Sequence, residues 1–257
     1  MVEIPRVIPV LLLKNAGLVK TVKFKEPKYI GDPLNAVKIF NEKEVDELIF
    51  LDITASNEKR MPPLKLLADI AGECFMPFCY GGGIRNIEMI KEILNVGVEK
   101  VSINTYAAEN PDFVRDAAEQ FGSSTIVISI DVKRNFLGKY EVIANSGKVN
   151  MKQDPVRYAV EMSKCGAGEL LVNSIDRDGT QNGYDIELIR KISKEVDIPV
   201  VACGGAGNLS DFKIAINEGG VSAVAAGSLF VFHGKHRGVL ISYPSQKELS
   251  NVFFENN

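Results

Sequence analysis

The chain has 257 residues, of which 46% are hydrophobic and 25% charged, and its formal net charge is −3. A slightly acidic balance argues against a general nucleic-acid binder, which is usually basic. No apolar run approaches the roughly 20 residues of a membrane span and the first residues lack a signal-peptide pattern, so we expect a cytoplasmic protein. The four cysteines form no CxxC pair, and with only two histidines they predict neither disulfides nor a metal site.

Eight apolar, β-branched runs alternate with segments of helical period along the chain. The predicted strands are 6–13, 47–53, 75–80, 100–104, 125–131, 169–175, 198–203 and 222–227. The predicted helices are 33–44, 61–73, 86–96, 111–121, 154–165, 185–196 and 209–218, with a last helix after 244. This alternation indicates a parallel sheet, and eight units in about 250 residues is the size of a (β/α)8 TIM barrel. We expect one barrel domain over residues 1–257, with a doubly wound open sheet as the alternative.

The two halves of the chain repeat each other. Asp52 matches Asp176, and Gly83 matches Gly205, at a nearly constant spacing of about 120 residues. A duplicated four-unit half-barrel gives this pattern, whereas an open sheet with a switch point does not. The repeat therefore favours the barrel.

Asp131 is the candidate acid or base, because it should stand where a buried strand ends and a loop begins. A carboxylate in that position can be partly desolvated, which tunes it for proton transfer. The repeat aligns it with Leu12, which cannot transfer a proton. Asp52, Asp176 and Asp178 also follow strands, but aspartates at such positions often cap loops or helix starts.

Two glycine clusters follow the third and seventh predicted strands, and each has polar partners after the next strand. Glycine lets backbone N–H groups approach a phosphate closely, and a following helix start adds partial positive charge. Tight turns are the simpler explanation, but two clusters at matched positions favour an elongated anionic or bisphosphorylated ligand. The candidate residues are Gly82, Gly83, Asn104, Thr105, Gly204, Gly205, Gly227 and Ser228.

Four residues of alternating charge stand at the starts of predicted strands: Arg6, Glu47, Lys100 and Glu169. Singly, each is an ordinary surface charge. Jointly, they can pair in a ring at the lower end of the barrel axis. A barrel that receives a small reactant from a partner docked underneath would need such a polar gate.

Two long loops follow the first and fifth strands. The segment 14–32 contains five lysines and predicts either a mobile basic loop that folds over an anion or a solvated surface loop. The segment 132–153 contains a turn at Asn145-Ser146-Gly147 and predicts a small hairpin.

Several longer strings resemble one family. The chain closely resembles the cyclase subunit of imidazole glycerol phosphate synthase over essentially all of residues 6–232. The strings that carry this resemblance are LDITAS at 51–56, GGGIR at 81–85, KVSINT at 100–105, DRDGT at 176–180 and GGAGN at 204–208.

The resemblance implies that a glutaminase binds the bottom of the barrel and that ammonia travels up the axis to two catalytic aspartates. It implies that the four charged strand starts are the gate, that Asp131 is one catalytic aspartate, and that Asp178 and Gly179 belong to the second phosphate site. The family's other catalytic aspartate is replaced by Leu12, so two-carboxylate cyclisation should be lost or severely slowed. Cys203 also stands where the family usually has a serine.

This departure, the first loop and the end of the chain resemble a cyclase-like paralogue associated with acetamidino modification of bacterial surface sugars. That resemblance implies a cofactor-free barrel that works with a glutaminase to supply ammonia to a separate sugar amidotransferase. The basic cluster His233, Lys235, His236 and Arg237 could then belong to a partner surface, or form a solvated turn. The alternatives are a working cyclase (lyase) of histidine biosynthesis and a non-catalytic activator of a glutaminase.

Overall fold

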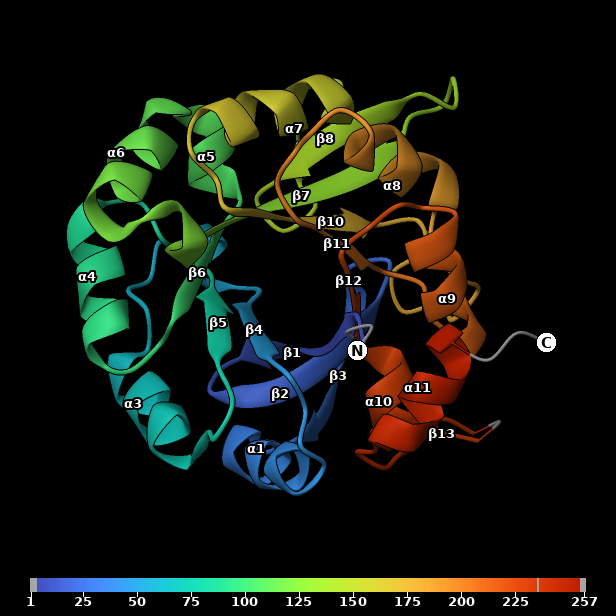
Figure 1. The fold of residues 1–257 in the computed structure, drawn as a ribbon. Coiled ribbons are helices and arrows are strands. Elements are labelled where there is room, and N and C mark those ends of the chain that lie inside the picture. Colours follow the sequence, from blue (N-terminus) through green and yellow to red (C-terminus); the bar gives the residue numbers. More distant parts are fainter. Residues whose placement is uncertain (1–3, 235, 255–257) are drawn as a thin grey trace.

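Eight parallel strands close into a barrel in the computed structural model, which describes residues 4–234 and 236–254 (Figure 1). Each strand pairs with the next, and the last pairs back with the first. The predicted (β/α)8 barrel is therefore confirmed. Its strands are β1 (Arg6–Lys14), β4 (Leu48–Asp52), β5 (Phe78–Gly81), β6 (Lys100–Ile103), β7 (Ile126–Arg134), β10 (Glu169–Ser174), β11 (Val200–Cys203) and β12 (Ala223–Ala226).

Helices form the outer layer around the barrel (Figure 1). The main ones are α1 (Pro33–Glu42), α3 (Leu64–Glu73), α4 (Ile87–Asn95), α6 (Asp112–Phe121), α7 (Pro155–Lys164), α8 (Ile186–Ser193), α9 (Leu209–Asn217) and α11 (Gln246–Phe254). Shorter turns of helix are α2 (Ala55–Glu58), α5 (Thr105–Glu109), α10 (Ser228–Val231) and the 3-10 turn η1 (Ser123–Thr125). None of the helices described is both long and apolar enough to cross a bilayer.

The half-barrel repeat is visible in the insertions. An antiparallel hairpin follows β1, formed by β2 (Gly17–Val22) and β3 (Lys25–Gly31), and another follows β7, formed by β8 (Tyr140–Ala144) and β9 (Val149–Asn150). The short helices α5 and α10 likewise follow β6 and β12. The predicted second hairpin is thus confirmed, whereas the segment expected as a loop at 14–32 is an ordered hairpin joined to β1.

The first hairpin is ordered because its residues satisfy the backbone of β1. Leu12 pairs with Val19 and Lys14 with Gly17 in antiparallel register. The turn at Lys23 and Phe24 has φ angles of 51° and 61°, the left-handed pair of a two-residue hairpin turn. A third hairpin, β13 (Phe232–His233) with β14 (Gly238–Val239), follows α10. Lys235, named in the basic cluster, lies outside the described residues.

Two apolar layers hold the fold. One fills the space between strands and helices and includes the fully buried Phe40, Phe50 and Phe212. The other lies inside the barrel and contains Ile8, Val10, Ile49, Cys79, Val127, Leu171, Val201, Cys203, Ala223 and Ala225. The barrel axis is therefore lined by apolar side chains between its two ends.

The half-barrel repeat predicts that two helix caps contribute similarly to the free energy of unfolding. Asn86 Oδ1 accepts from Met89 N (2.8 Å), and Asn208 Oδ1 accepts from Asp211 N (3.3 Å), at the starts of α4 and α9. Replacing either asparagine by alanine should lower the free energy of unfolding by about 0.5–2 kcal/mol. Asn95→Ala, at the exposed far end of α4, should change it by less than about 0.5 kcal/mol. Urea unfolding measures all three, and equal values for cap and control would contradict this account.

Candidate functional site

One cavity of about 510 Å³ opens at the carboxyl ends of the barrel strands. Its lining includes both Asp131 and Leu12 from the matched strands β7 and β1. The structure also brings to it every residue predicted to bind phosphate, namely Gly82, Gly83, Asn104, Thr105, Asp178, Gly179, Gly204, Gly205, Gly227 and Ser228. The residues predicted for this end of the barrel thus come together in one cavity, and their chemical roles stay predictions.

Asp131 is held at the cavity floor by two amides. Its Oδ1 accepts from Asn173 Nδ2 (3.1 Å) and its Oδ2 from Asn104 Nδ2 (3.3 Å). Its side chain is buried, and burial raises the pKa of this carboxyl to about 7, although the Asn173 hydrogen bond works in the opposite direction. Asp131 therefore carries a proton that it can give or take near neutral pH.

Lys20 is a site residue that sequence reasoning placed only in the basic loop. Strand β2 carries it into the cavity, where it is buried and its Nζ donates to the carbonyl of Val10. Burial lowers the pKa of this amine to about 8, and the charge of Asp178 partly opposes that shift. The sequence signal that could have indicated a buried lysine is its position inside the largely apolar run from Leu18 to Val22.

Asn173 was also missed. It lies on β10 beside Asp131 and is buried, and its Oδ1 has no hydrogen-bond partner. Because Asn173 Nδ2 bonds to Asp131, the amide orients the carboxylate and leaves an acceptor free. Nothing in the local sequence distinguishes this asparagine from a structural one.

The glycine clusters are required by close backbone packing. A Cβ on Gly82 would lie 2.7 Å from the backbone oxygen of Asp52, and one on Gly205 would lie 2.2 Å from that of Gly183. Both glycines also have positive φ angles. Tight turns therefore account for these glycines without a ligand, and phosphate binding there remains a proposal.

The hydroxyl partners of the clusters differ between the two halves. Thr105 Oγ1 accepts from Asn145 N (3.1 Å), so it holds the second hairpin as well as facing the cavity. Ser228 is buried at the start of α10. Asp52 makes a further local contact set, because it accepts from Thr54 N, Ala55 N and Arg60. That set supports the capping interpretation of Asp52.

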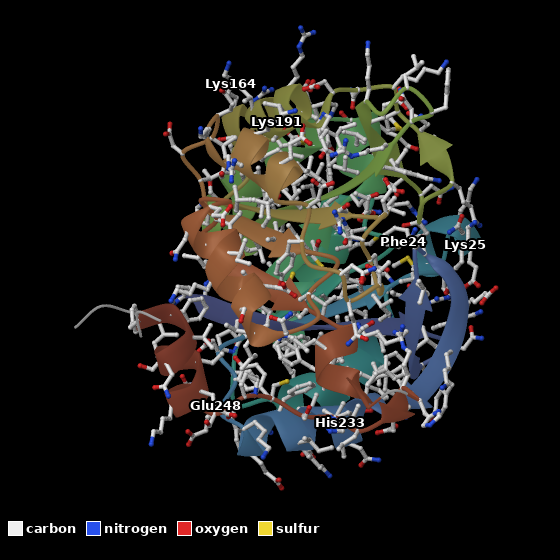
Figure 2. The ribbon with its side chains drawn as sticks, turned by 90° about the vertical axis from the view of Figure 1, so that its right-hand side faces the viewer. Phe24, Lys25, Lys164, Lys191, His233 and Glu248 are labelled. Atoms are coloured by element: carbon white, nitrogen blue, oxygen red, sulfur yellow. The ribbon has the colours of Figure 1, made fainter. Side chains whose placement is uncertain are left out.

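The first hairpin lies across part of the cavity mouth. Phe24 lines the cavity, and a Cβ on Gly147 of the second hairpin would lie 2.9 Å from the Phe24 ring. Lys23 N donates to Asp178 O (2.9 Å), which fixes the hairpin tip to the loop after β10. Figure 2 shows Phe24 and Lys25 at this end of the barrel.

The four charges predicted as a gate form a closed ring at the opposite end. Arg6 contacts both Glu47 and Glu169, and Lys100 Nζ lies 3.0 Å from Glu47 Oε1 and 3.1 Å from Glu169 Oε2. Both carboxylates are buried, whereas the two cations are partly exposed. Burial works to lower the pKa of Lys100, but the net shift is upward because Glu169 and Glu47 stabilise the cation.

Two further predictions concern metals and the last loop. Within the part of the chain that the structure describes, no three His, Cys, Asp or Glu side chains come together as a possible metal site.

His233 is exposed, and Arg237 stacks on Phe232 at 4.6 Å from its ring centre. Arg237 also donates to Gly179 O at the cavity rim.

The structure defines a (β/α)8 barrel protein with a charged ring at the strand starts and a cavity at the strand ends. A family model described as "Histidine biosynthesis protein" matches residues 6–237. The chain belongs to this family.

Within the family, the chain is similar to HisF-type subunits. It is 56% identical to "Putative imidazole glycerol phosphate synthase subunit hisF2" of Pseudomonas aeruginosa, over 95% of this chain and 97% of that protein. It is 47% identical to "Putative imidazole glycerol phosphate synthase subunit hisF3" of Vibrio vulnificus, over 95% of this chain and 94% of that protein. It is 43% identical to imidazole glycerol phosphate synthase subunit HisF of Alkaliphilus metalliredigens (89% and 90%).

The buried Asp131 predicts a pH-dependent stability. Its carboxyl is protonated in the folded protein up to about pH 7 but ionises near pH 4 when unfolded, so its contribution is present below pH 4 and is lost as the pH rises to 7. Asp131→Asn cannot ionise and should gain on the order of 2 to 4 kcal/mol over wild type between pH 4 and pH 8. Urea unfolding at both pH values measures this, and a pH-independent difference would refute the shift.

Proposed function

We propose that this protein is an ammonia-conducting barrel that works with a glutaminase at its strand-start end and serves a sugar-amidating enzyme at its cavity end. One observation carries the proposal: the charged ring and the apolar interior are intact, while the cavity above them has Leu12 in place of a second carboxylate. The ring and the apolar interior support entry of ammonia, and Leu12 argues against a two-carboxylate cyclisation.

The barrel interior suits a small neutral molecule. Moving an unpaired charge through an apolar core is far more costly than moving a neutral amine. Ammonium that gives up its proton at the ring becomes neutral ammonia, which can pass residues such as Ile8, Val127 and Ala225 more readily than ammonium can. The ring also supplies a polar entrance where ammonia can exchange hydrogen bonds with Glu47 and Glu169.

The cavity offers groups that could hold ammonia or an acceptor at the end of that path. Asn173 Oδ1 is an unpartnered acceptor at its floor, and Asp131 has a pKa of about 7. The lysines of the two hairpins make the mouth basic and the buried Lys20 adds an amine inside the cavity, which suits an anionic group such as a phosphorylated sugar. The acetamidino chemistry rests on the resemblance to the surface-sugar paralogue.

A working cyclase of histidine biosynthesis is the second candidate. The family match and the retained Asp131 favour it, and Leu12 opposes it, because one carboxylate has to do the work of two. A pure activator of a glutaminase is the third candidate. It would need the ring and the lower surface but would leave ammonia transfer through the barrel unused.

A plug in the barrel interior tests conduction. Ala225→Leu adds bulk inside the barrel, and Ala202→Leu adds the same bulk on the outer side of β11. With the glutaminase bound, the Ala225 variant should keep glutamine hydrolysis within about twofold but lose at least about tenfold in glutamine-dependent amidation. Added ammonium should restore product. Ala202→Leu is the control for added bulk and should amidate as wild type does. Unchanged amidation in the Ala225 variant would contradict conduction of ammonia through the barrel.

Restoring a carboxylate tests the cyclase alternative. The wild-type protein should give no turnover of the family's phosphoribulosyl substrate with ammonium, and Leu12→Asp should gain some. Leu51→Asp is the matched control, because Leu51 pairs with Leu12 and also lines the cavity. Product formation followed by chromatography decides between them, and wild-type turnover would make the cyclase the better function.

A further inference from the structure

Basic residues are concentrated in three segments of this chain. The segments 14–32, 132–154 and 227–245 contain 12 of the 30 Lys and Arg but only 4 of the 33 Asp and Glu, so they carry a net charge of +8. The remaining residues therefore carry −11. All three segments follow the carboxyl ends of barrel strands, namely β1, β7 and β12. The basic charge thus gathers around the cavity mouth.

Exposed apolar side chains gather on the same segments. Seven of the eleven large hydrophobic residues that are exposed in the described chain lie there, more than chance placement gives. Phe136 is 95% exposed and Leu137 67% exposed at the tip of the β7–β8 hairpin, and Tyr29 is 65% exposed on β3. Soluble proteins rarely gather such side chains on one face unless something covers them.

The three segments are joined by direct contacts. Phe24 packs against Gly147, which links the first hairpin to the second. Phe232 lies between Lys28 (5.6 Å) and Arg237 (4.6 Å), which links the first hairpin to the third. Figure 2 shows Phe24, Lys25 and the blue hairpin along one end of the molecule. We call these three joined segments the mouth collar.

The turn between β7 and β8, residues 135–139, is also held firmly on the barrel. Tyr140 donates to Asp185 Oδ1 (2.7 Å), and Arg134 lies over the Tyr140 ring at 4.2 Å while it pairs with Glu187 (2.8 Å). These contacts fix the two residues that flank the turn, Arg134 and Tyr140, on the start of α8 and leave Phe136 in the turn exposed. A projecting aromatic side chain on a rigid base is a typical binding anchor.

We propose that the mouth collar is the docking surface for an acidic face of the enzyme that consumes the ammonia leaving the cavity, an inference that rests on the proposed function. Basic residues steer an acidic partner to the surface, and the exposed aromatic side chains supply affinity after contact. Docking there places the acceptor site of the partner over the cavity mouth.

An anionic membrane is the competing occupant, and the charge distribution disfavours it. The rest of the molecule carries −11 and is repelled by an anionic surface beyond the collar. The apolar residues also lie on three separate hairpins rather than along one amphipathic helix, which is the usual form of an interfacial anchor. A bilayer across the collar would close the cavity and leave ammonia with no acceptor.

The test measures binding of a purified sugar amidotransferase from the same organism to the full-length barrel in complex with its glutaminase. Phe136→Ser should weaken this binding at least about tenfold. Phe75→Ser is the matched control, because Phe75 is 88% exposed in the loop before β5, at the other end of the barrel, and its loss should change binding less than twofold. Neither side chain is buried, so both variants should fold.

Charge reversal gives an independent measurement. Lys25→Glu with Lys139→Glu should slow association and flatten its salt dependence, whereas Lys65→Glu with Lys91→Glu, on the exposed faces of α3 and α4, should not. Vesicles of equimolar phosphatidylcholine and phosphatidylglycerol form the second arm. Vesicle binding that falls in the collar variants, without amidotransferase binding, would overturn the proposal in favour of a membrane.

Two outcomes separate this proposal from the function on which it rests. If Ala225→Leu blocks ammonia transfer but the collar variants bind the amidotransferase as wild type does, the docking proposal is overturned and the proposal of ammonia conduction is supported. If Ala225→Leu has no effect while Phe136→Ser abolishes amidotransferase binding, the docking proposal is supported and ammonia conduction is overturned. An amidotransferase that does not bind the complex at all overturns the collar.

Discussion

The pairing of β1 with β12 is the constraint on which the rest of the structure depends. Arg6 to Pro9 lie in parallel register with Ala223 to Ala226, and this pairing closes the sheet. A closed parallel barrel puts all strand starts at one end and all strand ends at the other. The charged ring and the cavity must therefore lie at opposite ends of one apolar axis. In an open sheet, Arg6 on the first barrel strand could not reach Glu169 on the sixth.

Burial moves the pKa values of two groups inside the cavity, Asp131 and Lys20, toward neutral pH from opposite sides. It raises the pKa of Asp131 to about 7 and lowers that of Lys20 to about 8. Groups with such values exchange protons readily near neutral pH, which is typical of working sites. Leu12, which the half-barrel repeat matches with Asp131, adds no titratable group to the cavity.

The barrel and its repeat could be predicted because they depend on patterns visible in the sequence, namely the alternation of apolar runs with helical segments and the spacing of about 120 residues between matching positions. The cavity residues on strand ends followed from the same periodicity, since parallel strands end together. Lys20 and Asn173 could not be found in this way. Lys20 enters the cavity only because an unrecognised hairpin folds back on β1. Asn173 matters only through its contact with Asp131, 42 residues earlier in the chain.

Gly227 shows how tightly the hairpin and the barrel depend on each other. Its φ angle of −116° is open to any residue, so conformational freedom does not explain a glycine there. A Cβ at this position would lie 1.9 Å from Lys20 Nζ. A larger residue at position 227 would therefore displace the amine of Lys20, more than two hundred positions away, from its hydrogen bond with the carbonyl of Val10. Over evolution, we expect the two positions to change together.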